Sequence, residues 1–137
     1  HYKEQIWEIV GEKPNRKGII KISFSFETIP EAKNFLAKIR LMQKRLRLLK
    51  KEVNAEMKSI RSNYSAKVSN VQAGFGSSLL FGKGTAKSLA ASKKREIKAQ
   101  RNRTLLPYEG VKRIIDRTLV ETDSAKLQVS TWLESNK

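Results

Sequence analysis

An apolar side chain recurs every three or four residues through the middle of the chain. The residues of this apolar stripe are Phe35, Ile39, Met42, Leu46, Leu49, Val53, Met57, Ile60, Tyr64, Val68 and Val71. Such spacing predicts one face of an α-helix. A helix of about 40 residues is roughly 60 Å long, which exceeds the diameter of a small domain. We therefore expect a second helix along the stripe, as in a coiled-coil arm.

Recognisable signals lie at both ends of this predicted helix. The sequence Thr28-Ile29-Pro30-Glu31 fits a capping box, in which the threonine hydroxyl accepts a hydrogen bond from the amide three residues later. Four glycines between residues 72 and 85 interrupt the helical pattern. Because glycine favours turns, this segment predicts the end of the long helix and a change of direction.

The rest of the chain again has helical periodicity. It predicts a helix over residues 86–103 and an amphipathic helix over residues 108–135. Pro107 between them is expected either to end the first helix or to mark a boundary. The simplest arrangement is a helical hairpin over residues 29–137, in which the later helices return along the apolar stripe.

The first 28 residues have the pattern of strands instead. Residues 2–10 roughly alternate polar and apolar side chains, and residues 18–27 alternate cleanly, with isoleucine and phenylalanine on one face. Period 2 with β-branched and aromatic residues favours strands. We therefore expect a β-hairpin over residues 1–28, packed on the helical hairpin in one structural unit. The predicted fold class is α+β and predominantly helical.

The chain is strongly basic, and most of its excess positive charge lies in the middle of the sequence. The 137 residues hold 29 lysines and arginines against 13 acidic residues, a formal net charge of +16. Residues 31–100 carry +13 of this excess. A net charge so far from zero indicates the kind of partner that the chain binds and says little about its fold. It points to nucleic acid, an anionic membrane surface or an acidic protein.

Six cations of the predicted long helix recur at sums of three and four residues, beside the apolar stripe. This basic stripe consists of Lys33, Arg40, Lys44, Arg47, Lys51 and Lys58. The acids of the same helix, Glu31, Glu52 and Glu56, have no lysine or arginine three or four positions away. Because like charges on one helix face repel, the basic stripe predicts a binding face for an anionic partner.

A second basic cluster occupies residues 93–103. Its cations are Lys93, Lys94, Arg95, Lys98, Arg101 and Arg103, and its one acid is Glu96. If the hairpin folds back, this cluster lies near the long helix and extends the same surface. The helix over 108–135, by contrast, places acids three or four residues from its cations. Such spacing is typical of an ordinary solvated surface.

The glycine-rich segment contains Gly82-Lys83-Gly84-Thr85, which is similar to the centre of a phosphate-binding loop. That loop needs a glycine at the position held here by Ser77, and a basic helix rather than a buried strand precedes it. We therefore interpret the segment as an interhelix turn. Its apolar residues between Phe75 and Phe81 either pack under the turn or form a tip that enters a lipid interface.

Side chains for catalysis and metal binding are scarce. The chain has no cysteine, and its one histidine is His1, so a thiolate metal site and a Ser/His/Asp nucleophile are excluded. We expect no cofactor, no metal and no enzymatic activity. The lack of cysteine and of any apolar run of about 18 residues predicts a cytoplasmic protein. Because the chain begins with His1 rather than methionine, we expect a piece of a longer or processed protein.

The leading hypothesis is a non-enzymatic module that binds the phosphate backbone of DNA or RNA with low sequence specificity. The basic stripe and the 93–103 cluster would carry it, and aromatic residues for base stacking are scarce in the basic region. One alternative is binding to an anionic membrane surface through the basic helix and the apolar tip. Another is a scaffold or oligomerisation protein that docks on an acidic partner. The long apolar stripe also predicts a homo-oligomer or a place in a larger complex.

Overall fold

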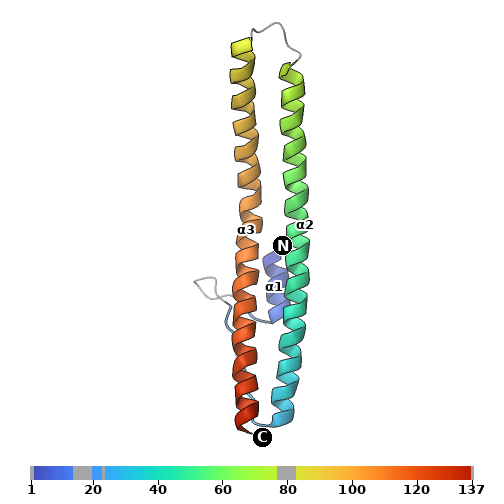
Figure 1. Ribbon diagram of the computed structural model, residues 1–137. Helices are drawn as coiled ribbons and strands as arrows, with labels where there is room; N and C mark the ends of the chain where they lie inside the picture. Colours follow the sequence, from blue (N-terminus) through green and yellow to red (C-terminus); the bar gives the residue numbers. More distant parts are fainter. Residues whose placement is uncertain (1, 14–19, 23, 77–82, 137) are drawn as a thin grey trace. The chain divides into compact units, whose positions relative to one another are not determined.

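The computed structural model is all-α in the part of the chain that it describes (Figure 1). The described residues are 2–13, 20–22, 24–76 and 83–136. They form α1 (Tyr2–Val10), α2 (Ile29–Gly76) and α3 (Lys83–Ser135), and none of them lies in a strand. The predicted α+β class with an N-terminal β-hairpin is therefore wrong. The chain divides into two compact units, His1–Val53 with Gly110–Lys137, and Asn54–Glu109.

Residues 2–10, predicted as a strand, form helix α1. A strand would place Glu4 and Glu8 on the same face as Ile6 and Val10. A helix separates them: both glutamates are exposed, whereas Ile6 and Val10 are buried. The apolar residues Tyr2, Ile6, Ile9 and Val10 have the i, i+4, i+7, i+8 spacing of one helix face. The short stretch fits the helical period better than alternation.

Helix α1 ends at Val10 and is followed directly by Gly11, which has a φ of +78°. The Gly11 N–H donates a hydrogen bond of 2.7 Å to the Trp7 carbonyl oxygen. This is the usual left-handed cap of a helix C-terminus, which favours glycine because other residues carry a Cβ. A Cβ at residue 11 would meet no atom within 4 Å, so only the backbone opposes a larger residue here.

We expect Gly11→Ala to lower the free energy of unfolding by about 1 kcal/mol, because the left-handed conformation costs a residue with a Cβ roughly that much. The matched control is Gly110→Ala within α3, where a Cβ would meet Arg113 Nη2 at an ordinary 3.9 Å. Alanine in a helix interior is better than glycine by about 1 kcal/mol, so the control should be stabilised. Urea unfolding followed by circular dichroism measures both changes. A Gly11→Ala protein as stable as the parent would contradict the role of the cap.

The second predicted strand, residues 18–27, has no regular secondary structure where it is described, from residue 20 onward. The alternation nevertheless predicts the inward side: Ile20 is buried and Phe24 and Phe26 are half-buried, whereas Lys21 and Ser25 are exposed. An extended segment becomes a strand only when a neighbouring backbone pairs with it. The expected neighbour, residues 2–10, is helical, and this is why the hairpin prediction is wrong.

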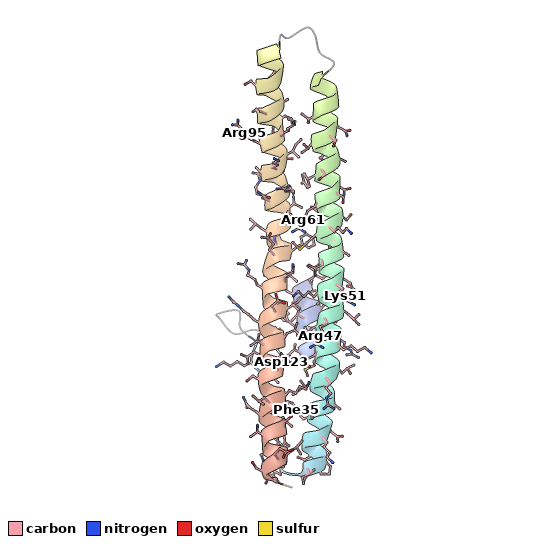
Figure 2. The ribbon with its side chains drawn as sticks, viewed as in Figure 1. Phe35, Arg47, Lys51, Arg61, Arg95 and Asp123 are labelled. Carbon is pink, nitrogen blue, oxygen red and sulfur yellow. The ribbon has the colours of Figure 1, made fainter. Side chains whose placement is uncertain are left out.

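Aromatic packing attaches this segment to the helices of the first unit. The ring centroid of Phe24 lies 4.9 Å from that of Phe35 on α2. The ring of Phe26 meets Trp132 on α3 edge to face, with centroids 4.8 Å apart. Figure 2 labels Phe35 on α2. Side-chain packing rather than a backbone ladder therefore holds residues 20–28.

The predicted start of the long helix is confirmed. The Glu31 N–H donates to Thr28 Oγ1 at 3.3 Å, and the Thr28 carbonyl oxygen accepts from the Ala32 N–H at 3.1 Å. The Glu31 carboxylate accepts from the Glu27 N–H at 3.0 Å, one residue earlier than in a standard capping box. These bonds satisfy donors that the first turn of a helix leaves unpaired.

In the first unit α2 and α3 pack side by side and antiparallel (Figure 1). Gln43 Nε2 donates to Thr122 Oγ1 at 3.0 Å, and Lys50 Nζ lies 2.6 Å from Asp116 Oδ1. As α2 advances from residue 43 to 50, its partner on α3 recedes from 122 to 116, so the helices run in opposite directions. The predicted helical hairpin is confirmed, although the connection at residues 77–82 lies outside the described part.

The core of the first unit has a seven-residue repeat. Each helix contributes three fully buried residues at intervals of seven. They are Ile39, Leu46, Val53, Ile115, Thr122 and Val129. This is the spacing of paired helices in a coiled coil. None of the eleven residues of the apolar stripe is exposed, so the predicted core face of the long helix is confirmed.

The core of the second unit is smaller. Among its described residues only Met57, Ile97 and Leu105 are buried. Tyr64 Oη and Thr104 Oγ1 are 3.0 Å apart and share a hydrogen bond between α2 and α3. A second phenol, that of Tyr108 on α3, hydrogen-bonds to Glu56 on α2. These two contacts set the antiparallel register of this unit.

Burial, and then the hydrogen bond and the charge of Glu56, raise the pKa of Tyr108 above its ordinary value of 10.0. The folded chain thus holds the phenol proton more tightly than the unfolded chain does. The stability from this contact is therefore complete below pH 10.0 and is lost as the pH rises through the raised pKa.

Pro107 does not end a helix, because α3 continues through it to Ser135. Proline removes one backbone hydrogen bond and costs a helix interior about 3 kcal/mol. Leu105 and Val111 on either side are buried, and Tyr108 is bound to Glu56. Packing of this turn offsets the cost, which is why the predicted break is absent.

Candidate nucleic-acid interface

Five of the six residues of the basic stripe lie on the part of α2 in the first unit. All five are exposed: Lys33, Arg40, Lys44, Arg47 and Lys51. Steps of seven, four, three and four residues keep them on one flank of a helix with 3.6 residues per turn. Figure 2 labels Arg47 and Lys51 on α2 and Asp123 on α3. The helix thus presents a row of cations to solvent.

None of these five cations has an acidic partner within 4 Å in the described part of the chain. Two acids of α3 bind other groups of α2: Asp116 pairs with Lys50 at 2.6 Å, and Asp123 accepts from Gln43 Nε2 at 2.6 Å. Asp116 has Lys112 and Arg113 four and three residues away on its own helix, but its ion pair is with Lys50 across the hairpin. The stripe therefore keeps its charge available for an external anion.

Two exposed leucines border the basic stripe, and neither was among the predicted site residues. Leu41 and Leu48 are 47% and 51% exposed and lie seven residues apart on α2. Each directly follows a member of the stripe, Arg40 or Arg47. In the sequence, only their position two residues after the core residues Ile39 and Leu46 indicates that they lie off the buried face. Because leucine is usually a core residue, this position alone does not predict exposure.

The second unit carries more net positive charge per residue than the first unit does. Its residues 54–109 hold eleven cations and three acids, a net charge of +8, and the longer first unit also holds +8. Lys58, the sixth residue of the basic stripe, is exposed on α2 in this unit. The density of positive charge here gives the second unit its own attraction for polyanions.

The 93–103 cluster does not form a single face of α3. Lys94 and Arg101 are half-buried, whereas Lys93, Arg95, Lys98 and Arg103 are exposed. Positions 93, 95, 98 and 103 point around the helix at 3.6 residues per turn. The expected proximity to the long helix is confirmed for Lys98 and Arg101, which line a groove together with residues of α2.

This interhelix groove of the second unit has a volume of about 280 Å³. Its lining residues are Tyr64, Ser65, Val68 and Ser69 from α2, and Ile97, Lys98 and Arg101 from α3. Tyr64 and the two serines were not predicted as site residues. The i, i+4 spacing of Ser65 and Ser69 was visible in the sequence, but their position opposite Lys98 and Arg101 depends on the helix register.

Tyr64 lies on α2 six residues beyond Lys58 of the basic stripe, and its ring is already engaged. Lys67 Nζ lies 4.6 Å from the ring centroid, and the phenol oxygen shares a hydrogen bond with Thr104. A base that stacked on this ring would have to displace Lys67. The arrangement favours contact with phosphates over contact with bases.

Comparison with known protein families, with curated protein sequences and with solved structures gives no match to this chain. In the described ranges no helix is long and apolar enough to cross a membrane. Over the same residues no group of three or more His, Cys, Asp or Glu side chains is placed to hold a metal ion.

Proposed function

We propose that this chain is a non-enzymatic protein that binds the phosphate backbone of nucleic acid with low sequence specificity. The observation that carries the proposal is the row of exposed cations on α2 without acidic partners within the described residues. An unpaired row of cations repels itself along the helix. A polyanion laid along the row would remove that repulsion.

The spacing of the basic stripe suits a nucleic-acid backbone. From Arg40 to Lys51 the helix advances about 16 Å at a rise of roughly 1.5 Å per residue. Duplex DNA carries one charge for about every 1.7 Å of its axis. Several phosphates therefore lie within reach of Arg40, Lys44, Arg47 and Lys51. Arginine and lysine make strong charge-assisted hydrogen bonds to phosphate oxygens.

One observation favours a second candidate, binding to an anionic membrane surface. Leu41 and Leu48 form an exposed apolar pair directly beside the cations of the stripe. A helix with apolar residues next to lysine and arginine is typical of proteins that lie in the lipid interface. The apolar tip expected to contribute, Phe75–Phe81, falls outside the described side chains.

The test is fluorescence anisotropy of a labelled DNA duplex and of a labelled RNA hairpin across a salt titration. We expect micromolar or tighter binding near physiological salt, and a log–log slope of about −4 or steeper, at roughly −0.9 for each phosphate contact. Vesicles with and without anionic lipid form the second arm. Failure to bind either nucleic acid at low salt would overturn the proposal, and binding to anionic vesicles alone would favour the membrane candidate.

A further inference from the structure

The interhelix groove of the second unit gathers hydrogen-bond donors from two helices. Ser65 and Ser69 lie one turn apart on α2, and Lys98 and Arg101 lie one turn apart on α3. None of the seven residues that line the groove is acidic. The nearest acid in sequence, Glu96, pairs with Lys93 at 3.5 Å. The groove therefore has a positive potential and hydroxyl groups in one place.

The donors of the groove keep hydrogen-bonding capacity. Arg101 donates from Nε and Nη2 to Asn102 Oδ1, each at 3.3 Å. A guanidinium has five N–H donors, so three of them remain. In the described structure Ser65, Ser69 and Lys98 have no side-chain hydrogen bond or ion pair. These groups can turn toward a bound anion without first breaking a contact.

Apolar side chains form the rest of the groove and strengthen the attraction. Val68 and Ile97 line it beside the donors, and Ile97 is buried. Low polarity beside a charged hydrogen bond makes that bond electrostatically stronger than it is in bulk water. The groove is also large enough, at about 280 Å³, to hold a small anion with some of its water.

We propose that this groove binds a single phosphate group through Ser65, Ser69, Lys98 and Arg101. A phosphate presents several oxygens in a tetrahedral arrangement, which suits donors that approach from two helices. Arginine binds two phosphate oxygens at once, and lysine adds a point charge. The phosphate comes either from a small phosphorylated molecule or from a nucleic-acid backbone. The second source rests on the function proposed above.

The first arm of the test uses inorganic phosphate and the whole chain. Amide chemical shifts recorded by NMR during a phosphate titration should change first around residues 65–69 and 98–101. The variant Ser65→Ala/Ser69→Ala should weaken the binding about tenfold or more, because two hydrogen bonds to a charged group are lost. The matched control Ser59→Ala/Ser62→Ala removes two exposed serines of α2 that do not line the groove. It should bind as the parent does.

The second arm uses duplex DNA in a phosphate-free buffer. Ser65→Ala/Ser69→Ala should lower the affinity about tenfold without changing the salt slope, because it removes no charge. Arg101→Gln should reduce the magnitude of the slope by about 0.9, the value of one phosphate contact. The pair of variants thus separates hydrogen bonding in the groove from general charge attraction.

The two arms fail separately. Inorganic phosphate bound at the groove without duplex binding would support the groove and overturn the nucleic-acid function. Duplex binding that Ser65→Ala/Ser69→Ala leaves unchanged, as its control does, together with no phosphate-induced shifts at the groove, would overturn the proposed phosphate site. The nucleic-acid function would then remain intact. Phosphate-induced shifts that are spread over all lysines, and that are equal in the variant and the parent, would also overturn the proposed phosphate site.

Discussion

Leu46→Ala is expected to lower the free energy of unfolding by about 3 kcal/mol, within the range for a leucine removed from a packed core. Leu46 is fully buried and lies seven residues from Ile39 and from Val53, which are also fully buried. The substitution removes apolar contacts and leaves a cavity between α2 and the rest of the first unit. Urea unfolding followed by circular dichroism at 222 nm measures the change.

Leu48→Ala is the matched control, two residues away on the same helix. Leu48 is 51% exposed, so its truncation should change stability by less than about 0.5 kcal/mol. Alanine has at least the helix propensity of leucine. A loss at Leu46 alone is therefore due to packing and not to a weaker helix. Equal effects of the two substitutions would contradict the assignment of the core face.

The parts of the fold that were predicted correctly depend on local patterns. The apolar stripe repeats over 37 residues from Phe35 to Val71, so one chance residue does not alter its period. The capping box at Thr28 involves neighbours within four residues. Exposure of the basic stripe follows from the same helical period, since its residues lie beside the buried face. Each of these features is fixed by residues that are close in sequence.

The N-terminal errors come from short or ambiguous patterns. Residues 2–10 are too few to separate a period of 2 from one of 3.6 by counting alone, although Gly11 directly after them is a helix-stop signal. Residues 20–28 are alternating and lie against the helices as expected. Alternation reports which side faces inward, and it does not report whether another backbone is present to pair with.

The specific contacts between α2 and α3 could not be predicted from the sequence. The bonds from Lys50 to Asp116 and from Gln43 to Asp123 join residues 66 and 80 positions apart. They depend on the register of two helices, and a shift of one turn would pair other residues. Within the second unit, the register of its own two helix segments places Ser65 and Ser69 opposite Lys98 and Arg101. Pro107 also illustrates the influence of tertiary structure, because packing overrides the tendency of proline to break a helix.

Neutralisation of the stripe is the change with the largest expected effect on binding. The variant Arg40→Gln/Lys44→Gln/Arg47→Gln/Lys51→Gln should reduce the magnitude of the salt slope for duplex DNA by about 3.6, because each lost phosphate contact accounts for roughly 0.9. Near 0.15 M salt the affinity should fall about 10³-fold. Its stability should not fall, since these side chains are exposed and mutually repulsive. Anisotropy across a salt titration, with urea unfolding in parallel, measures both quantities.

The matched control removes the same net charge from α3. Lys112→Gln/Arg113→Gln/Arg117→Gln/Lys126→Gln neutralises four cations of the first unit that have acids three or four residues away. If the basic stripe holds the phosphates, this variant changes the slope by less than about 1, one phosphate contact. Equal losses in the two variants would show that the net charge of +16, rather than a face on α2, attracts the nucleic acid. The difference between the two slopes is therefore the quantity that assigns binding to the stripe.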